Sequence, residues 1–193
     1  TYGTDEKHGW WREIIDGGYI PRHDYQFLTF NVIGSPFGSS SKLNDLNFPQ
    51  HLTLRDIVKA IEKGIKALDF DKINILIGAS LGGMQAMELL YNNQFQIDKA
   101  IILAATGKTS SYSRAFNEIA RQAIHLGGKE GLSIARQLGF LTYRSSKSYD
   151  QRFTPDEVVT YQQYQGNKFK KNFDLQCYLT PVSYTHLTLP TSD

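Results

Sequence analysis

The residues Gly78-Ala79-Ser80-Leu81-Gly82 stand between a β-branched run at 73–77 and a helix-forming stretch at 83–90, and this arrangement indicates the fold. A serine at a sharp turn from strand to helix must adopt a strained backbone conformation, which glycines two residues to either side accommodate. Strain of this kind costs about 1 to 3 kcal/mol and is usually kept where a site uses it. The pattern predicts a nucleophile elbow with Ser80 as the nucleophile, and the alternative is a structural glycine-rich turn.

Strands and helices alternate around this turn. An apolar run at 26–32 predicts a buried strand, and a polar loop rich in Gly, Ser and Pro follows it. An amphipathic helix is predicted next, because Thr53 and Asp56 have the spacing of a capping box and apolar residues then recur on one helical face. Strands are predicted at 73–77 and 99–105. This order is typical of an α/β fold whose parallel sheet is covered on both faces.

From about residue 109 to residue 179 the pattern changes to helices alone. Apolar residues recur there at helical spacing in three stripes: Phe116, Ile119, Ala120, Ala123 and Ile124; Leu132, Ala135 and Leu138; and Val158, Val159, Tyr161, Tyr164 and Phe169. Thr154 before Pro155 marks a helix start. A helical block downstream of a nucleophile indicates a cap over the active site. We therefore expect a partial α/β core at 1–107 and a helical cap at 108–179.

Composition excludes several classes of protein. The 193 residues are 40% hydrophobic and 21% charged, as in ordinary globular proteins, and the net charge of +2 favours neither nucleic acid nor a membrane surface as a partner. No apolar run reaches the roughly 18 residues of a membrane span. The single cysteine, Cys177, suits a reducing compartment, so we expect a cytoplasmic protein. No cluster of His, Cys and carboxylates has ligand spacing, so no metal site is predicted.

Five stretches, taken in order, resemble the homoserine O-acetyltransferases, the acyl-CoA-dependent branch of the α/β-hydrolases. They cover roughly residues 8–179 and are Asn31-Val32-Ile33-Gly34 with Gly38-Ser39; Leu54-Arg55-Asp56-Ile57-Val58; Gly78-Ala79-Ser80-Leu81-Gly82-Gly83-Met84-Gln85-Ala86; Ala115-Phe116-Asn117-Glu118 with Arg121-Gln122-Ala123-Ile124; and Gly131-Leu132-Ser133-Ile134-Ala135-Arg136 with the cap segments Leu141-Thr142-Tyr143-Arg144-Ser145 and Tyr164-Gln165-Gly166 with Lys168-Phe169. The resemblance implies a partial α/β-hydrolase fold. It also implies transfer of an acetyl group from acetyl-CoA, a co-substrate rather than a bound cofactor, to the hydroxyl of L-homoserine in methionine biosynthesis.

The resemblance also assigns roles to residues and partners. Ser80 would carry the acetyl group as an acyl-enzyme, and the Leu81 backbone N–H would be one oxyanion donor. Arg136 would bind the substrate carboxylate through its planar fork, and the alternative is an ordinary surface arginine. The full-length parent would be a homodimer that acts on small molecules.

The triad partners of the serine are expected to be missing. In this fold an Asp or Glu and then a His follow the serine, and in the family resembled here both follow the cap. The histidines of this chain are expected to lie on the surface, in the cap or in the tail: His8, His23, His51, His125 and His186. The tail at 180–193 departs from the family and is expected to be non-native.

We therefore expect an inactive fragment of an acyltransferase. The alternatives are a serine esterase or thioesterase on the same fold, and a truncated protein without catalytic activity. Succinyl in place of acetyl as the donor group, and serine in place of homoserine as the acceptor, also stay open.

Overall fold

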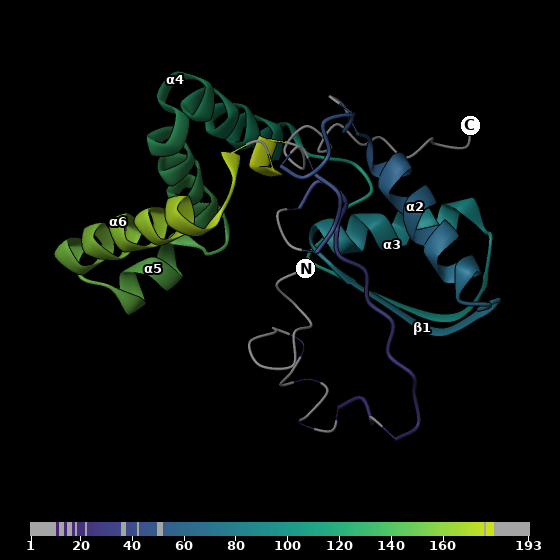
Figure 1. Cartoon of the computed structure of the whole chain (residues 1–193). Helices are drawn as coiled ribbons and strands as arrows, with labels where there is room; N and C mark the ends of the chain where they lie inside the picture. Colours follow the sequence, from purple (N-terminus) through teal and green to yellow (C-terminus); the bar gives the residue numbers. More distant parts are fainter. Residues whose placement is uncertain are drawn as a thin grey trace. The chain divides into compact units, whose positions relative to one another are not determined.

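The computed structural model describes residues 11, 14, 17, 19–21, 23–35, 38–41, 43–49, 52–175 and 177–179. The chain divides into two compact units, Thr1–Phe48 and Pro49–Asp193. The regular elements that concern the site all belong to the second unit (Figure 1). The predicted domain boundaries at 107/108 and 179/180 stay predictions, and the tail at 180–193 lies outside the described residues.

Helix α2 (Leu54–Ala67) begins as its sequence predicts. The Thr53 side chain accepts from the backbone N–H of Asp56, and the Asp56 carboxylate accepts from the N–H of Thr53 at 2.9 Å, which completes the capping box. Leu54, Ile57 and Val58 are buried on one face. The Thr53 hydroxyl also donates to the Asp56 carboxylate at 2.6 Å, and this bond, together with the one from the Thr53 N–H, lowers the pKa of Asp56 because both favour its charged form.

Strand β1 (Lys72–Ala79), helix α3 (Leu81–Asn92) and strand β2 (Gln96–Leu103) follow and form a parallel β-α-β unit. The register places Ile73 opposite Ile97 and Ala79 opposite Leu103. Helix α3 packs on both strands, and α2 packs against α3 (Figure 1). Buried Glu88 of α3 accepts from Arg55 Nε of α2 at 2.8 Å, which ties the two helices together. The predicted strand–helix–strand order is confirmed here.

The prediction of a strand at 26–32 is wrong for this structure. Residues 25–32 have no regular secondary structure, and most of their side chains are exposed. An apolar run becomes a strand only when a neighbouring strand supplies its ladder hydrogen bonds. In the part of the chain that the structure describes, the sheet has the order β1-β2 and no further strand joins it.

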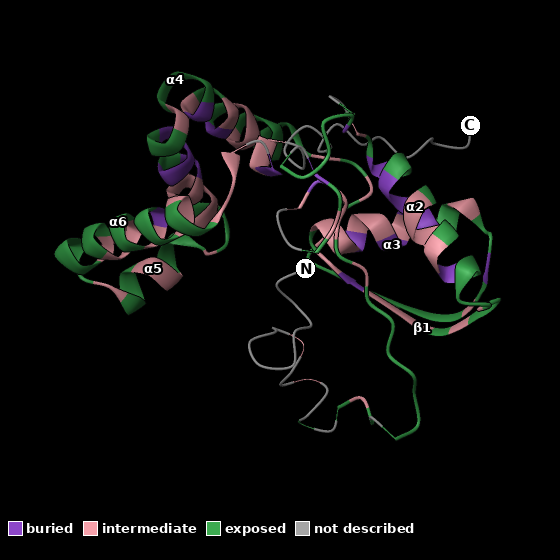
Figure 2. Cartoon of the chain, in the orientation of Figure 1, coloured by how far each residue is buried: buried purple, intermediate pink, exposed green. Residues whose placement is uncertain are grey.

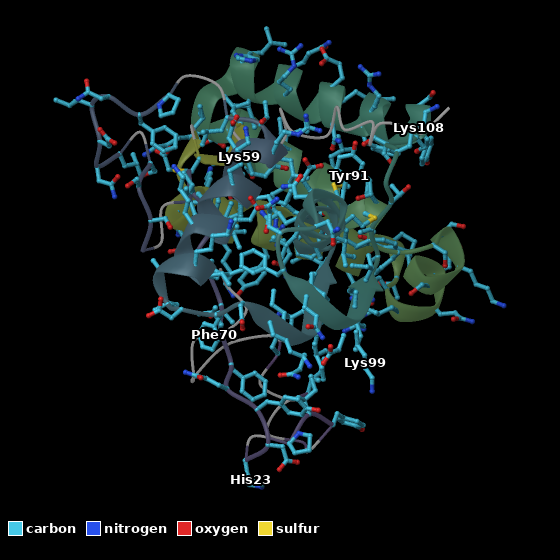
Figure 3. All side chains as sticks on the ribbon, turned by 90° about the vertical axis from the view of Figure 1, so that its right-hand side faces the viewer. His23, Lys59, Phe70, Tyr91, Lys99 and Lys108 are labelled. Carbon is cyan, nitrogen blue, oxygen red and sulfur yellow. The ribbon has the colours of Figure 1, made fainter. Side chains whose placement is uncertain are left out.

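Only one face of the described sheet carries a helix, so the expected cover on both faces is not observed. A single right-handed crossover places its helix on one side of the two strands that it joins. On the opposite face Ile101 and Leu103 are each 43% exposed, and the strands are coloured mainly as exposed or intermediate in Figure 2. Figure 3 shows the Lys99 side chain on β2 extending away from the sheet.

The helical block consists of α4 (Ser111–Thr142), α5 (Ser146–Arg152) and α6 (Pro155–Asn172). Gly128, with φ 53° and ψ −122°, interrupts α4 and bends it. Helix α6 begins at the predicted Thr154, whose side chain forms a capping box with Glu157. No helix in the described part of the chain is both long enough and apolar enough to cross a membrane.

A small apolar core holds this block together. Ala120 and Ile124 from the first half of α4 meet Leu132 and Ala135 from the second half, and Phe169 of α6 packs against them. Two glycines permit the close approach. A Cβ on Gly131 would overlap the Ala123 carbonyl, and a Cβ on Gly166 would overlap the Ser133 hydroxyl of α4. Residues from all three predicted apolar stripes therefore contribute to this core, whereas Ile119, Val159 and Tyr164 of those stripes are exposed.

Glu118 on α4 offers a prediction that an NMR titration can check. It accepts two hydrogen bonds from Arg121, at 2.9 and 2.6 Å, and one from Gln122, at 2.8 Å. The bond from Arg121 is the main reason that its pKa falls to about 2. We expect a carbon-detected NMR titration to find that midpoint in the intact chain. Arg121→Ala should raise the midpoint toward the ordinary value of roughly 4.

The sign of the linked stability follows from the lowered pKa. The pair stabilises the folded chain above about pH 4, where the unfolded carboxyl is ionised, and this contribution is lost as the pH falls toward 2. A midpoint that stays near 2 in the Arg121→Ala protein would show that the arginine does not set the pKa of Glu118.

Candidate active site

Ser80 has the strained backbone that a nucleophile elbow requires. Its φ of 53° and ψ of −120° lie outside the regions that residues with a side chain ordinarily occupy. Its N–H donates to the Leu103 carbonyl at 2.9 Å, and its carbonyl accepts from the Met84 N–H at 3.1 Å. The backbone of Ser80 is therefore bound to the end of β2 on one side and to the first turn of α3 on the other.

The hydroxyl of Ser80 is not used to hold this turn. A serine at the N-cap usually accepts a hydrogen bond from the helix that it precedes, but Ser80 makes no such side-chain bond. The residue is also exposed. Ser80 therefore combines a strained backbone with a hydroxyl that is accessible to a substrate.

The glycines around Ser80 contribute unequally. A Cβ on Gly78 would overlap the carbonyl oxygen of Gly82 and lie 2.9 Å from the Gly83 Cα, whereas a Cβ on Gly82 would meet none of the described residues within 4 Å. A Cβ on Gly83 would lie 2.5 Å from the Ala105 Cβ. Close approach is therefore needed at Gly78 and Gly83, and the sequence-based explanation for Gly82 is wrong.

The end of β2 supports the elbow in a way that the sequence alone did not reveal. Ala104 follows Leu103 and has φ 48°, a second strained residue without a glycine's freedom. Ala104 comes directly after Leu103, whose carbonyl accepts the hydrogen bond from the Ser80 N–H. In the sequence, the signal for this support of the elbow was the adjacent pair of small residues Ala104 and Ala105.

Leu81 is the first residue of α3. The first N–H groups of a helix have no partners inside the helix, and together they make its N-terminus a site for negative charge. No acidic residue stands in the first turn of α3 to cancel that charge. The Leu81 N–H therefore has the setting expected of an oxyanion donor beside Ser80, and its role stays a prediction.

Arg136 lies in the second half of α4 and is half-buried. Its guanidinium carbon is 4.5 Å from the ring centroid of Phe140 and 4.8 Å from that of Phe169. The structure thus places it against two aromatic rings, and its role in binding the substrate carboxylate stays a prediction. Phe140, four positions after Arg136 on the same helix, was a sequence signal for the first of these ring contacts that the prediction did not use.

The structure does not add a histidine to the site. His125 is an exposed residue of α4, and His23 is exposed in the first unit. Among the described residues no histidine hydrogen-bonds to Ser80. His8, His51 and His186 lie outside the described residues. Within the described segments no group of three or more His, Cys, Asp or Glu side chains could hold a metal ion.

A strained, exposed serine between a parallel strand and a helix N-terminus is the arrangement of an α/β-hydrolase nucleophile. Residues 3–127 match the α/β hydrolase fold family. The chain belongs to that family.

Within this fold the chain is similar to homoserine O-acetyltransferases. It is 33% identical to the homoserine O-acetyltransferase of Geotalea uraniireducens, over 91% of this chain and 57% of that protein. The crystal structure of homoserine O-acetyltransferase from Staphylococcus aureus is 80% identical, with a TM-score of 0.90, over 97% of this chain and 58% of that one. The chain therefore spans a little over half the length of these relatives. The acetyl esterase MekB, at 17% identity and a TM-score of 0.65, shares the fold.

Proposed function

We propose that the full-length protein that contains this chain is an acyltransferase that moves an acetyl group from acetyl-CoA to the hydroxyl of L-homoserine. The observation that carries the proposal is the backbone of Ser80, held at φ 53° with its hydroxyl unused as a cap. The similarity to homoserine O-acetyltransferases over nearly the whole chain supports the choice of substrates.

The proposed reaction has two half-reactions. The Ser80 oxygen attacks the thioester carbon, the carbon–sulfur bond breaks, and CoA leaves as its thiol with the serine proton. The homoserine hydroxyl then attacks the acetyl ester, and its proton returns to Ser80. In each tetrahedral intermediate the Leu81 N–H donates to the oxyanion, and a donor of this kind typically contributes about 3 to 4 kcal/mol.

Three further parts belong to the proposal. Arg136 binds the homoserine carboxylate. The general base is a histidine of the full-length protein and its acidic partner is an aspartate. Neither is one of the residues given a role above. The helical block from α4 to α6 excludes water, which competes with homoserine for the acyl-enzyme. The protein has no resident cofactor and is a homodimer in the cytoplasm.

The first experiment is to read the source DNA past both ends of this frame. A frame that continues beyond the Leu179 codon and encodes an Asp and then a His supplies the missing partners, and that complete protein is the one to assay. A frame that ends without them would overturn the proposed mechanism.

Arg136→Ala in the complete protein distinguishes a transferase from an esterase. We expect kcat/KM for homoserine to fall about 100-fold, because two charge-assisted hydrogen bonds to the carboxylate are lost. Hydrolysis of a simple acetyl ester should change less than about threefold. Arg114→Ala, which removes an exposed arginine from the first turn of the same helix, is the control. Equal losses in both reactions would contradict the assignment and favour an esterase.

A further inference from the structure

Arg136 is surrounded by aromatic rings from two helices. Phe140 lies one turn further along α4, and Phe169 comes from α6. Both rings approach the guanidinium carbon within 5 Å, at 4.5 and 4.8 Å from their centroids. Contacts of this kind with the face of a ring stabilise a cation and leave its N–H groups for other partners.

No anion of the described chain pairs with this cation. The ion pairs within 52–175 and 177–179 join other residues: Arg55 to Glu88, Lys72 to Asp98, Arg121 to Glu118, and Lys170 to Glu130. Tyr178 stacks edge-on against Phe169 near Arg136, but burial raises the pKa of Tyr178 to about 12. Its hydroxyl is therefore neutral at physiological pH and does not act as a counter-ion.

The two rings are themselves held in place. Phe169 stacks on Phe173 with centroids 4.7 Å apart and planes at 16°, and it packs against the buried core of the helical block. Phe140 meets Tyr161 edge-to-face at 5.7 Å. Rings that cannot swing away hold the stacked guanidinium in one orientation, so less entropy is lost when a planar anion binds to its edge.

We infer that Phe140 and Phe169 are positioning residues that hold the Arg136 fork for the carboxylate of the acceptor substrate, and thereby set the preference for an acceptor that carries a carboxylate. This inference rests on the proposed function. The rings meet the guanidinium through their faces, and its edge presents paired N–H donors in the plane that a carboxylate matches. The two phenylalanines therefore act through Arg136 and do not touch the acceptor's reacting atoms.

The test measures kinetics of the complete protein with L-homoserine and with L-homoserine amide, in which a neutral amide replaces the carboxylate. Phe140→Leu and Phe169→Leu should each raise KM for homoserine about 5- to 20-fold and change kcat less than about twofold, because each removes one cation–π contact. Kinetics with the amide should be unchanged. Phe140→Tyr and Phe169→Tyr keep a ring face and should restore KM to within about twofold of the parent protein.

Phe153→Leu is the matched control. Phe153 is a half-buried residue of the same helical block, and its ring centroid is 4.8 Å from that of Tyr161. Tyr161 contacts Phe140, which in turn contacts Arg136, so Phe153 does not itself contact the guanidinium. It should leave KM unchanged although it removes a similar amount of aromatic packing. Phe140 also lies outside the buried core cluster against which Phe169 packs, so Phe140→Leu keeps the test valid if Phe169→Leu fails to fold.

Two outcomes would overturn the inference. One is an equal rise in KM for homoserine and its amide. The other is a failure of the tyrosine variants to restore KM for homoserine. Either result would indicate that the leucine variants act through loss of packing alone.

Calorimetric binding of L-homoserine to the Ser80→Ala protein separates this inference from the proposed function. Binding that weakens in the leucine variants, in a protein whose parent shows no acetyl transfer, would refute the proposed function and still support the role of the two rings in binding a carboxylate. Normal transfer in the parent with unchanged binding in the leucine variants would refute the inference alone.

Discussion

Ser80→Ala in the complete protein should lower kcat for acetyl transfer about 10,000-fold or more, the largest effect expected of any substitution in this chain. The reason is that the acetyl group would have no oxygen on which to form the acyl-enzyme, while the elbow keeps its shape. The measurements are the steady-state transfer rate and the mass of the peptide that contains Ser80 after incubation with acetyl-CoA. The peptide should gain the mass of one acetyl group in the parent protein and nothing in the variant.

Ser80→Gly is the companion variant, since it also lacks the hydroxyl but relieves the backbone. Glycine adopts φ 53° and ψ −120° without a clash, so this protein should be about 1 kcal/mol more stable than Ser80→Ala. Thermal or urea unfolding gives the difference. Equal stability of the two variants would mean that the elbow stores no strain, and residual transfer near the parent rate would remove Ser80 from the mechanism.

Gly78→Ala should destabilise the folded chain by about 3 kcal/mol and reduce transfer with it. The added methyl group would overlap the carbonyl of Gly82, and the atoms it meets are backbone atoms that cannot rotate away. The overlap can be relieved only if the turn between β1 and α3 widens. This movement would separate the Ser80 hydroxyl from the Leu81 N–H. The unfolding free energy and kcat should therefore fall together.

Gly82→Ala is the matched control, because it changes the other glycine of the same motif by the same methyl group. In the described part of the chain a Cβ there meets nothing within 4 Å, and Gly82 lies in the first turn of α3. Alanine favours a helix over glycine, so stability should rise by about 0.5 to 1 kcal/mol. A similar loss of stability in both variants would contradict the packing described for the elbow.

The structure confirms the predictions that depend on local chemistry. Thr53 was identified as a helix start because its hydroxyl and the carboxylate of Asp56 satisfy N–H groups within one turn, and Thr154 because it stands before Pro155. The run before Ser80 was identified as a strand because it is short and rich in β-branched residues. Such signals need no knowledge of distant residues.

The predictions that failed depended on partners elsewhere in the chain. The apolar run at 26–32 has the composition of a strand, but composition does not say whether a neighbouring strand is present to pair with it. The role given to Gly82 failed for a similar reason, since only the path of the backbone shows that Gly83 is the residue pressed against Ala105. Arg136 was singled out by resemblance. Phe140 lies four positions along the same helix, but the second aromatic neighbour, Phe169, came to Arg136 only when α4 and α6 packed together.

The order of strands and helices, the helix caps and the position of the strained serine follow from the sequence alone, because hydrogen bonds and periodicity within a few residues carry that information. The packed structure was needed to show which glycines permit close contact, which face of the sheet is covered, and how the guanidinium of Arg136 is held. These features arise where segments far apart in the sequence meet, and the steric and π contacts between them have no counterpart in the local pattern.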